Sequence, residues 1–256
     1  MSVISMNYLS KYMMRHVRVN IILPHEEMHP ERGVKPPWKT LYFLHGYTEN
    51  ADLLMSCFHM VEMSSKYGIA IVVPDGENSF YVNHSARNSS YENMMAEELV
   101  KVTRMLFPLS DKYEDTWIGG FSMGGFGALM LGLRHSDTFS KIAALAPACM
   151  PYGRIGGHYF PDEMLTDLFG GREKYFAEYD PFSLMMQHKT RGTRMPELFM
   201  RCGPDDVMVY EVCSELREKM SNAGIALDYG ELPGGHTAEF ANRVIPETAE
   251  FLLKKS

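Results

Sequence analysis

The sequence predicts one α/β domain over residues 1–256, built on a mostly parallel sheet with helices on both faces. Two kinds of segment alternate along the 256 residues. Short continuous apolar runs, such as residues 41–44 and 69–73, are typical of strands covered on both faces. Longer stretches such as residues 91–107 carry apolar side chains at helical spacing. This alternation favours parallel strands joined by helical crossovers, and the length is ordinary for a single domain.

The first half of the chain supplies three strands and two helices. Residues 17–23 alternate apolar and polar side chains, which predicts a half-exposed strand at the antiparallel edge of the sheet. The Pro-rich residues 24–37 predict a loop. The remaining elements are buried strands at 41–44 and 69–73, a helix with Leu54, Phe58 and Val61 on one face that ends near Gly68, and the helix at 91–107.

The alternation breaks between residues 147 and 195. This segment holds glycine pairs, prolines and eight aromatic side chains: Tyr152, Tyr159, Phe160, Phe169, Tyr175, Phe176, Tyr179 and Phe182. It is too short for a good core of its own, so we expect a cap-like insertion over the top of the sheet. Beyond it we expect a strand at 197–201, a helix ending at Gly224, a strand at 226–232 and a closing helix at 238–254.

A glycine-flanked serine lies between a predicted strand and a predicted helix. Residues 116–119 form a short apolar run that leads into Gly120-Phe121-Ser122-Met123-Gly124, and residues at helical spacing follow. A strand, G-x-S-x-G and a helix place the serine on a strained turn with its hydroxyl exposed. The glycines remove side chains that would collide around that turn. Ser122 is therefore the candidate nucleophile, although a Gly-rich helix start packed against a sheet gives the same pattern.

A serine hydroxyl needs a positioned base, and the base needs an orienting acid. After such an elbow the acid and then the histidine follow the serine along the chain. We expect His236 to be the base because it follows a strand in a Gly-rich loop, whereas His135 ends the elbow helix and is expected to face solvent. Asp205 and Asp206 follow the strand at 197–201, where the acid is expected. Spacing does not separate these two aspartates, and one of them can equally cap the next helix.

A tetrahedral oxyanion needs two positioned N–H donors. One should be the amide of Met123, directly after the serine. The other should come from the loop His45-Gly46-Tyr47 after the first buried strand, where Gly46 permits a turn that aims the Tyr47 amide into the site. We expect His45 to support this loop structurally.

Charge and composition argue against several classes of partner and cofactor. The formal net charge of −7 argues against a nucleic-acid surface or an anionic membrane surface. No apolar run reaches 18 residues and the N-terminal segment has no continuous apolar core, so we expect no membrane span, no signal peptide and a cytoplasmic protein. Residues 25–29 match the zinc pattern H-E-x-x-H, but prolines bracket them inside a loop, so no metal is expected. The oligomeric state is open, a homo-oligomer included.

With these residues placed, the sequence resembles the esterase D-like branch of the α/β-hydrolases, especially the bacterial tributyrin esterase and cinnamoyl (feruloyl) esterase group. The resemblance extends over nearly the whole chain. Its motifs are Val19-Asn20-Ile21-Ile22-Leu23-Pro24, Leu44-His45-Gly46-Tyr47, Pro74-Asp75-Gly76-Glu77-Asn78-Ser79-Phe80-Tyr81, Glu97-Glu98-Leu99, Gly120-Phe121-Ser122-Met123-Gly124-Gly125 and Gly234-Gly235-His236.

The resemblance implies a serine carboxylesterase that hydrolyses short acyl or aryl (cinnamoyl or feruloyl) esters without a metal or organic cofactor. It points to Asp206 as the acid, at the second acidic position of Cys-Gly-x-[Glu/Asp]-Asp, although relatives often carry Glu-Asp where this chain has Asp-Asp. We expect the aromatic-rich insertion to line the substrate pocket. Two alternatives are a thioester hydrolase like the S-formylglutathione hydrolases and a catalytically silent hydrolase fold used for binding.

Overall fold

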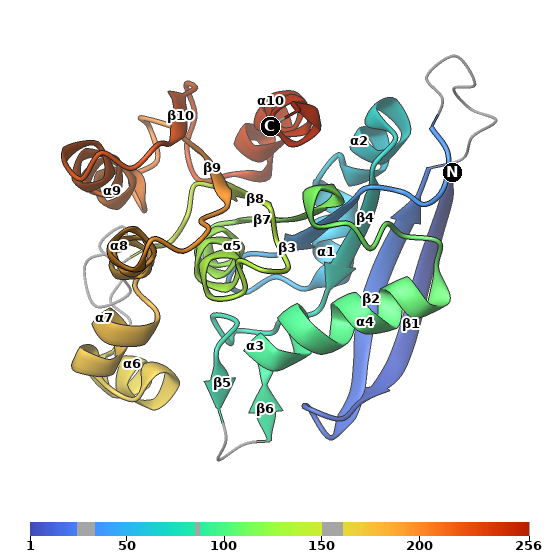
Figure 1. Ribbon diagram of the computed structural model, residues 1–256, viewed down its shortest axis with the longest axis horizontal. Coiled ribbons are helices and arrows are strands. Elements are labelled where there is room, and N and C mark those ends of the chain that lie inside the picture. The colour runs from blue at the N-terminus through green and yellow to red at the C-terminus, as the bar shows by residue number, and fades with distance from the viewer. Residues whose placement is uncertain (25–33, 85–87, 150–160, 256) are drawn as a thin grey trace.

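The computed structural model describes residues 1–24, 34–84, 88–149 and 161–255, and its centre is an eight-stranded sheet (Figure 1). The strand order is β1-β2-β4-β3-β7-β8-β9-β10. Pairing is antiparallel for β1–β2 and β2–β4 and parallel from β4 to β10, which confirms the mostly parallel sheet. The strands are β1 (Ser2–Ser10), β2 (Arg15–Leu23), β3 (Thr40–Leu44), β4 (Ala70–Pro74), β7 (Thr116–Phe121), β8 (Lys141–Leu145), β9 (Glu197–Cys202) and β10 (Asp228–Glu231), with a separate two-stranded ribbon of β5 (Asn83–His84) and β6 (Ser89–Ser90).

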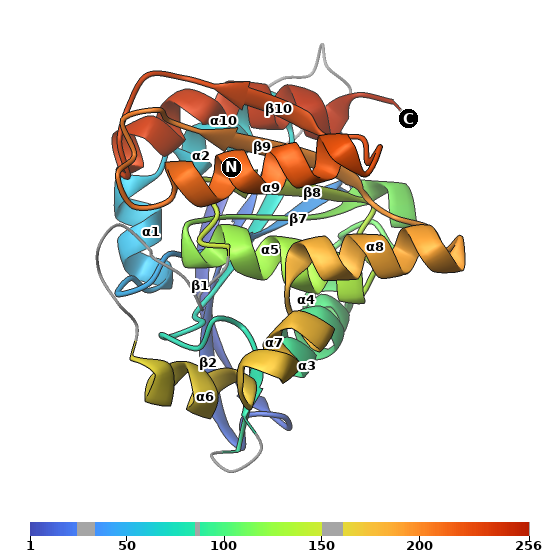
Figure 2. The ribbon, with the colours of Figure 1, turned by 90° about the vertical axis from the view of Figure 1, so that its left-hand side faces the viewer.

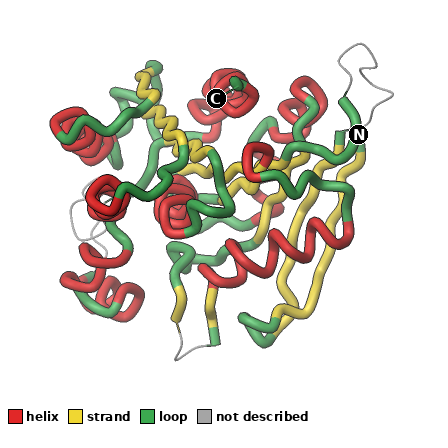
Figure 3. The backbone as a smooth tube through the Cα atoms, viewed as in Figure 1, coloured by secondary structure: helices red, strands yellow, loops and turns green. Residues whose placement is uncertain are grey.

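Helices cover both faces of the sheet, as Figures 1 and 2 show. One face carries α1 (Ala51–Cys57), α2 (Met60–Tyr67) and α10 (Ala238–Leu253). The other carries α5 (Met123–Arg134), α8 (Pro181–Arg191), α9 (Tyr210–Asn222) and a helical run made of α3 (Tyr91–Asn93), a π-helical stretch (Met94–Leu99) and α4 (Val100–Leu106). The short helices α6 (Asp162–Phe169) and α7 (Arg172–Glu178) precede α8, and a 3₁₀ turn spans Tyr113–Asp115. The result is a three-layer α/β arrangement, which the tube drawing makes visible (Figure 3).

The predicted antiparallel edge was placed one strand too far inward. The strand expected at 17–23 is β2, and β1 pairs with it on the outer side over all nine of its residues. In β1 the side chains of Ile4, Met6 and Tyr8 pack against the core, while Val3 and Leu9 on the other face are exposed. Residues 4–8 alternate apolar and polar side chains, which is a strand signal that the sequence-based prediction did not use; the apolar Val3 and Leu9 interrupt the alternation at both ends.

Two further predictions change in detail. The single helix expected before Gly68 is interrupted at Phe58, whose extended backbone separates α1 from α2. Gly68 does end α2, with φ of 69°, and Gly224 after α9 has φ of 62°, so both glycines hold the left-handed conformation expected at a helix end.

The described aromatic residues of the segment 147–195 belong to the core. Phe169 and Tyr175 are buried and contact Phe126 of α5, with ring centroids 6.1 and 6.3 Å away. Phe80 joins the same cluster, 5.9 Å from both Phe126 and Phe169. The expectation that these rings line a substrate pocket is wrong for the described part of the segment, since they hold α6 and α7 against α5. Tyr152, Tyr159 and Phe160 lie outside the described residues, as does the H-E-x-x-H segment at 25–29.

No helix in the described ranges is both long and apolar enough to cross a bilayer.

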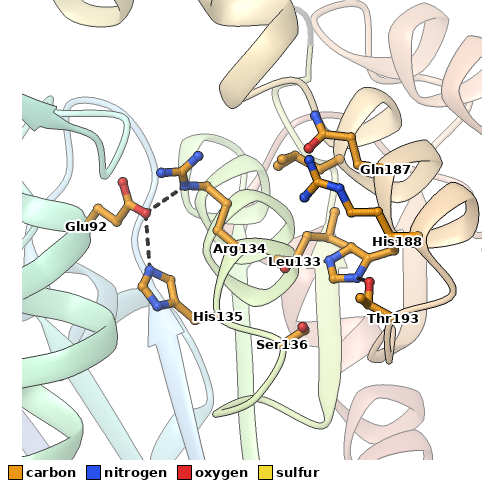
Figure 4. A pocket seen from close by; sticks show the side chains of 10 residues that line it. Glu92, Leu133, Arg134, His135, Ser136, Gln187, His188 and Thr193 are labelled. Atoms are coloured by element: carbon orange, nitrogen blue, oxygen red, sulfur yellow. Dashed lines mark hydrogen bonds and ion pairs between the residues drawn. The ribbon is translucent and has the colours of Figure 1, made fainter.

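A buried carboxylate joins α3 to the end of α5. Glu92 Oε1 accepts hydrogen bonds from Arg134 Nε at 2.7 Å and from His135 Nε2 at 3.1 Å (Figure 4). Burial alone would raise the pKa of Glu92, but the hydrogen bonds from His135 and Arg134 outweigh it and leave the pKa below its ordinary value. His135 therefore contacts this carboxylate, and the expectation that it faces solvent is wrong.

We predict that Glu92→Gln lowers the free energy of unfolding by about 2 kcal/mol near pH 7, because a charged acceptor is replaced by a neutral one. The folded pKa of Glu92 is lowered, so its stabilising effect is present above the unfolded pKa of about 4.3 and is lost as pH falls through the folded value. The difference between wild type and variant should therefore shrink in acid. Urea unfolding at several pH values measures it. Glu62→Gln, at an exposed site on α2, should change little at any pH, and a Glu92→Gln difference that persists unchanged in acid contradicts the assignment.

Candidate active site

Ser122 lies on a strained turn between β7 and α5. Its φ and ψ are 57° and −117°, a region that residues other than glycine rarely adopt. The backbone is held there because Ser122 N donates to Leu145 O at 3.0 Å and Ser122 O accepts from Ala148 N at 3.0 Å. The serine is thus fixed to the end of β8 as well as to its own strand and helix.

The two flanking glycines leave room for this turn. A Cβ on Gly124 would lie 2.0 Å from Leu44 O, and a Cβ on Gly120 would lie 2.3 Å from Gly124 O. Both distances are far below van der Waals contact with backbone atoms that cannot move away. The steric role that the sequence assigned to these glycines agrees with this packing.

Three side chains from distant parts of the chain meet above the ends of the strands. His236 Nε2 lies 2.7 Å from Ser122 Oγ, and His236 Nδ1 lies 2.6 Å from Asp206 Oδ2. Asp206 is 1% exposed and follows β9, whereas His236 follows β10 in a Gly-rich loop. The Phe121 ring lies beside the imidazole, with centroids 4.7 Å apart, and limits its orientation.

The proton positions follow from the partners. A carboxylate only accepts, so His236 Nδ1 carries the hydrogen that faces Asp206. In the neutral imidazole Nε2 is then an acceptor, and Ser122 Oγ donates to it. The other carboxylate oxygen, Asp206 Oδ1, accepts from the amides of Met208 and Val209 at 3.0 and 3.1 Å. This hydrogen bonding satisfies a nearly inaccessible charge and fixes its direction.

The neighbouring Asp205 points elsewhere. Its Oδ2 accepts from Gly234 N at 3.0 Å, so it contacts the backbone of the histidine loop and not the imidazole. The two loops touch at Gly203 as well, where a Cβ would lie 1.9 Å from Gly234 O. Geometry therefore separates two aspartates that spacing left equivalent.

The loop after β3 lies against the serine and is fixed by several hydrogen bonds. A Cβ on Gly46 would be 3.5 Å from Ser122 Cβ, which places this loop directly beside Ser122. His45 is fully buried; its Nδ1 donates to Gly46 O and its Nε2 accepts from Gly76 N, both at 2.8 Å. These contacts agree with the structural role expected for His45.

Tyr81, Asn78 and Glu49, for which the sequence alone predicts no role, support the same loop. Tyr81 is buried, which raises its pKa well above the ordinary value, so the hydroxyl keeps its proton and donates to His45 O at 2.8 Å. Asn78 Oδ1 accepts from Thr48 N at 2.7 Å, and Glu49 Oε2 accepts from Gly46 N at 2.8 Å. Asn78 and Tyr81 both belong to the motif Pro74–Tyr81, so this motif was the sequence signal for residues that support the loop.

A cavity of about 310 Å³ opens on the serine. Apart from the Gly46–Glu49 loop, its lining is largely apolar and aromatic, and Glu49 contributes a carboxylate. It includes Phe80, Phe121, Ser122, Met123, Ala148, Met208, His236, Thr237 and Ala238. Tyr47 and Met123, the residues expected to supply oxyanion donors, both belong to this lining, and the Met123 amide lies in the first turn of α5, where amides have no intrahelical acceptor.

A second cavity, of about 350 Å³, lies at the opposite end of α5 (Figure 4). Arg134 and Arg191 contribute to it, and each lies in the last turn of its helix, α5 or α8, where a cation complements the helix dipole. His188 Nε2 lies 2.8 Å from Leu133 O and Nδ1 lies 2.8 Å from Thr193 Oγ1. The polar side chains of this cavity thus bind backbone groups and complement dipoles at helix ends, or bind Glu92. Ser122 is not among its lining residues.

Comparison with known proteins places the chain in a family. A sequence profile of the family "Putative esterase" matches residues 10–250. The chain belongs to this esterase family. The esterase is 31% identical over 268 aligned residues to an acetyl esterase from Caldicellulosiruptor saccharolyticus, and the alignment covers 100% of both proteins.

Solved structures agree on the fold. The esterase resembles FphF, a fluorophosphonate-binding serine hydrolase from Staphylococcus aureus, with a TM-score of 0.87, 23% identity and 99% of both chains covered. It also resembles an S-formylglutathione hydrolase from Staphylococcus aureus, with a TM-score of 0.84, 23% identity and 99% coverage of both chains. The esterase therefore has the α/β-hydrolase fold and is a carboxylic ester hydrolase.

The unequal contacts of the two aspartates predict unequal effects. Asp206→Asn should lower kcat by about 10⁴-fold, because an amide facing Nδ1 favours the wrong imidazole tautomer. Asp205→Asn removes only a carboxylate that accepts from the Gly234 amide and should lower kcat by about tenfold or less. Initial rates with p-nitrophenyl acetate, with circular dichroism to verify folding, compare the pair. A larger loss in Asp205→Asn than in Asp206→Asn would reverse the assignment.

Proposed function

We propose that the esterase hydrolyses short-chain acyl and small aryl esters through an acyl-enzyme formed on Ser122. The observation that carries the proposal is the continuous hydrogen-bonded series Ser122–His236–Asp206, open to an apolar cavity. The hydroxyl, the imidazole and the buried carboxylate are already within proton-transfer distance.

In the proposed mechanism His236 Nε2 takes the Ser122 proton as Oγ attacks the ester carbonyl. Asp206 remains ionised and stabilises the imidazolium. The amides of Met123 and Tyr47 hold the oxyanion of the tetrahedral intermediate. The imidazolium then protonates the leaving alcohol, and a water molecule clears the acyl group by the same route. Every step uses this chain's own groups and needs no metal or organic cofactor.

Cavity size and lining support short substrates. About 310 Å³ is at the small end for ligand sites. The volume suits an acetyl or butyryl ester or a planar aromatic acid better than a long acyl chain. The acetyl esterase that is similar over its whole length agrees with the shortest of these.

Glu49 bears on the charge of the substrate. Its carboxylate belongs to the cavity lining and is held beside Gly46, the residue packed against Ser122. A fixed negative charge in a largely apolar cavity repels anionic substrates. Neutral esters are therefore favoured over dicarboxylate thioesters such as S-formylglutathione.

The proposal predicts a defined activity profile. Turnover should be highest for acetyl and butyryl p-nitrophenyl esters, lower for octanoyl esters, and lower for S-formylglutathione than for acetyl esters. Turnover of methyl ferulate measures whether small aryl esters are also substrates, as proposed. Ser122→Ala should lower kcat by about 10⁴-fold or more and abolish labelling by a fluorophosphonate probe. Faster turnover of S-formylglutathione would favour the thioester alternative, and a folded wild type that neither turns over esters nor takes the probe would favour a silent fold.

A second prediction concerns charge selectivity. Glu49→Gln keeps an acceptor for the Gly46 amide but removes the charge, so kcat/KM for mono-p-nitrophenyl succinate relative to p-nitrophenyl acetate should rise about tenfold. Glu77→Gln is the matched control, since that carboxylate is exposed, pairs with Arg15 and is absent from the cavity lining. Equal ratios in wild type and Glu49→Gln would show that Glu49 exerts no charge selection.

A further inference from the structure

One border of the sheet lacks the features that keep edge strands apart. Among the described residues no strand pairs with the outer edge of β1. This strand is nine residues long and contains no charged residue and no proline. The opposite border, β10, has only four residues and carries Asp228 and Glu231 at its ends. Short length and charge protect an edge strand from pairing, and β1 has neither.

β1 and the elements near it carry most of the exposed large apolar side chains. The structure has eight exposed large hydrophobic residues in its described ranges, and six lie in β1, in the residues flanking it or in the last turn of α4: Met1, Val3, Leu9, Met14, Met105 and Leu106. Val3 and Leu9 are 53% and 66% exposed on the face of β1 that turns away from the core. In Figure 1, α4 crosses in front of β1 and β2 and its last turn reaches the side of the molecule where β1 is the border. The helical run that ends in α4 contacts Tyr8 and Ser10 on the core-facing side of β1, so Val3 and Leu9, on the other side, are the exposed apolar residues that a partner strand at this edge would reach.

We propose that the partner at this surface is a second copy of the chain, with β1 paired antiparallel to its own symmetry mate across a two-fold axis at Met6. The two sheets then become one continuous sheet. The sequence Ser2-Val3-Ile4-Ser5-Met6-Asn7-Tyr8-Leu9-Ser10 has the same order of polar and apolar residues in both directions from Met6. A two-fold interface requires such self-complementarity.

The proposed register matches side chains on both faces. Val3 lies opposite Leu9 of the second copy on the exposed face, and Ile4 lies opposite Tyr8 on the core-facing side. Ser5 pairs with Asn7, and Met6 pairs with itself. Directly opposite residues are the pairs that stabilise a sheet.

Neighbouring registers do not give this match. The backbone N–H and C=O groups on the outer edge of a strand belong to alternate residues. When a strand pairs antiparallel with its own copy, the two-fold axis therefore moves from one residue to the next between allowed registers. With the axis at Ser5, Val3 would face Asn7. With the axis at Asn7, Leu9 would face Ser5. Only the axis at Met6 pairs both exposed apolar side chains.

Charge also favours this surface for self-association. The protein carries a formal net charge of −7, so an arbitrary contact between two copies brings like charges together. β1 has no charged side chain, and pairing it with itself adds no repulsion within the strand contact.

The test uses charges placed at positions 3 and 9. Wild type should sediment at twice the monomer mass of 29.2 kDa. Val3→Glu and Leu9→Lys each place a charge opposite an apolar residue at two symmetry-related positions and should raise the dimer dissociation constant about tenfold. Mixing the two variants should restore association through one Glu–Lys pair. The double variant V3E/L9K should restore it through two such pairs. Within one strand these residues are six positions apart, so they do not pair with each other.

Leu53→Lys is the control, because it places a lysine at an exposed apolar residue of α1, outside β1. It should sediment like wild type. All variants should keep wild-type esterase activity, since β1 lies outside the cavity lining. A wild type that stays monomeric at all concentrations overturns the proposal, and so does a dimer that both single variants leave intact. Weakening by each variant without recovery in the mixture or the double variant overturns the Met6 register.

Discussion

The structure depends on the backbone conformation of Ser122. A residue other than glycine at φ of 57° and ψ of −117° costs about 1–3 kcal/mol, and such strain persists only where the surroundings determine it. Here the surroundings do determine it, because α5 begins directly after the serine and Gly124 in its first turn packs on Leu44 O. In addition, Leu145 O and Ala148 N form hydrogen bonds with the backbone of Ser122. Removing the strain would mean displacing a helix that is buried along almost its whole length. Ser122, the proposed nucleophile, is therefore positioned by the core of the protein and not by its own loop.

The loop after β3 and the loop that carries His236 both contact the turn at Ser122. The loop after β3 packs on Ser122 through Gly46 and is held from behind by Tyr81, which a Cβ on Gly76 or Gly127 would strike at 2.2 or 2.4 Å. The His236 ring lies beside the ring of Phe121, the residue before the serine. Each of these loops thus contacts Ser122 or the residue before it directly. The position of one loop therefore does not depend on the position of the other.

Much of this arrangement could be predicted because its causes are local. Two glycines around Ser122, apolar runs bounded by breakers and a Gly-rich loop before His236 are visible over a few residues. β1 was missed although Ile4 to Tyr8 alternate apolar and polar side chains, because Val3 and Leu9 break the pattern at both ends and leave only a short signal. The aromatic segment was misplaced for a different reason: composition shows that Phe169 and Tyr175 need a partner, but not that the partner is Phe126. The bond between Glu92 and Arg134 spans 42 positions and leaves no trace in either local sequence.

The adjacent aspartates show how one backbone position separates two roles that sequence alone leaves equal. Asp206 turns inward, where its carboxylate is almost inaccessible and is held by two amides and the imidazole. Asp205 holds the amide of Gly234, whose φ of 146° only glycine adopts readily. Both carboxylates therefore act on the loop that carries His236, one on the ring and one on the main chain two residues before it. Because Gly203 packs on Gly234 O and Asp205 accepts from Gly234 N, the loops that carry Asp206 and His236 are held together by contacts other than the hydrogen bond between those two side chains.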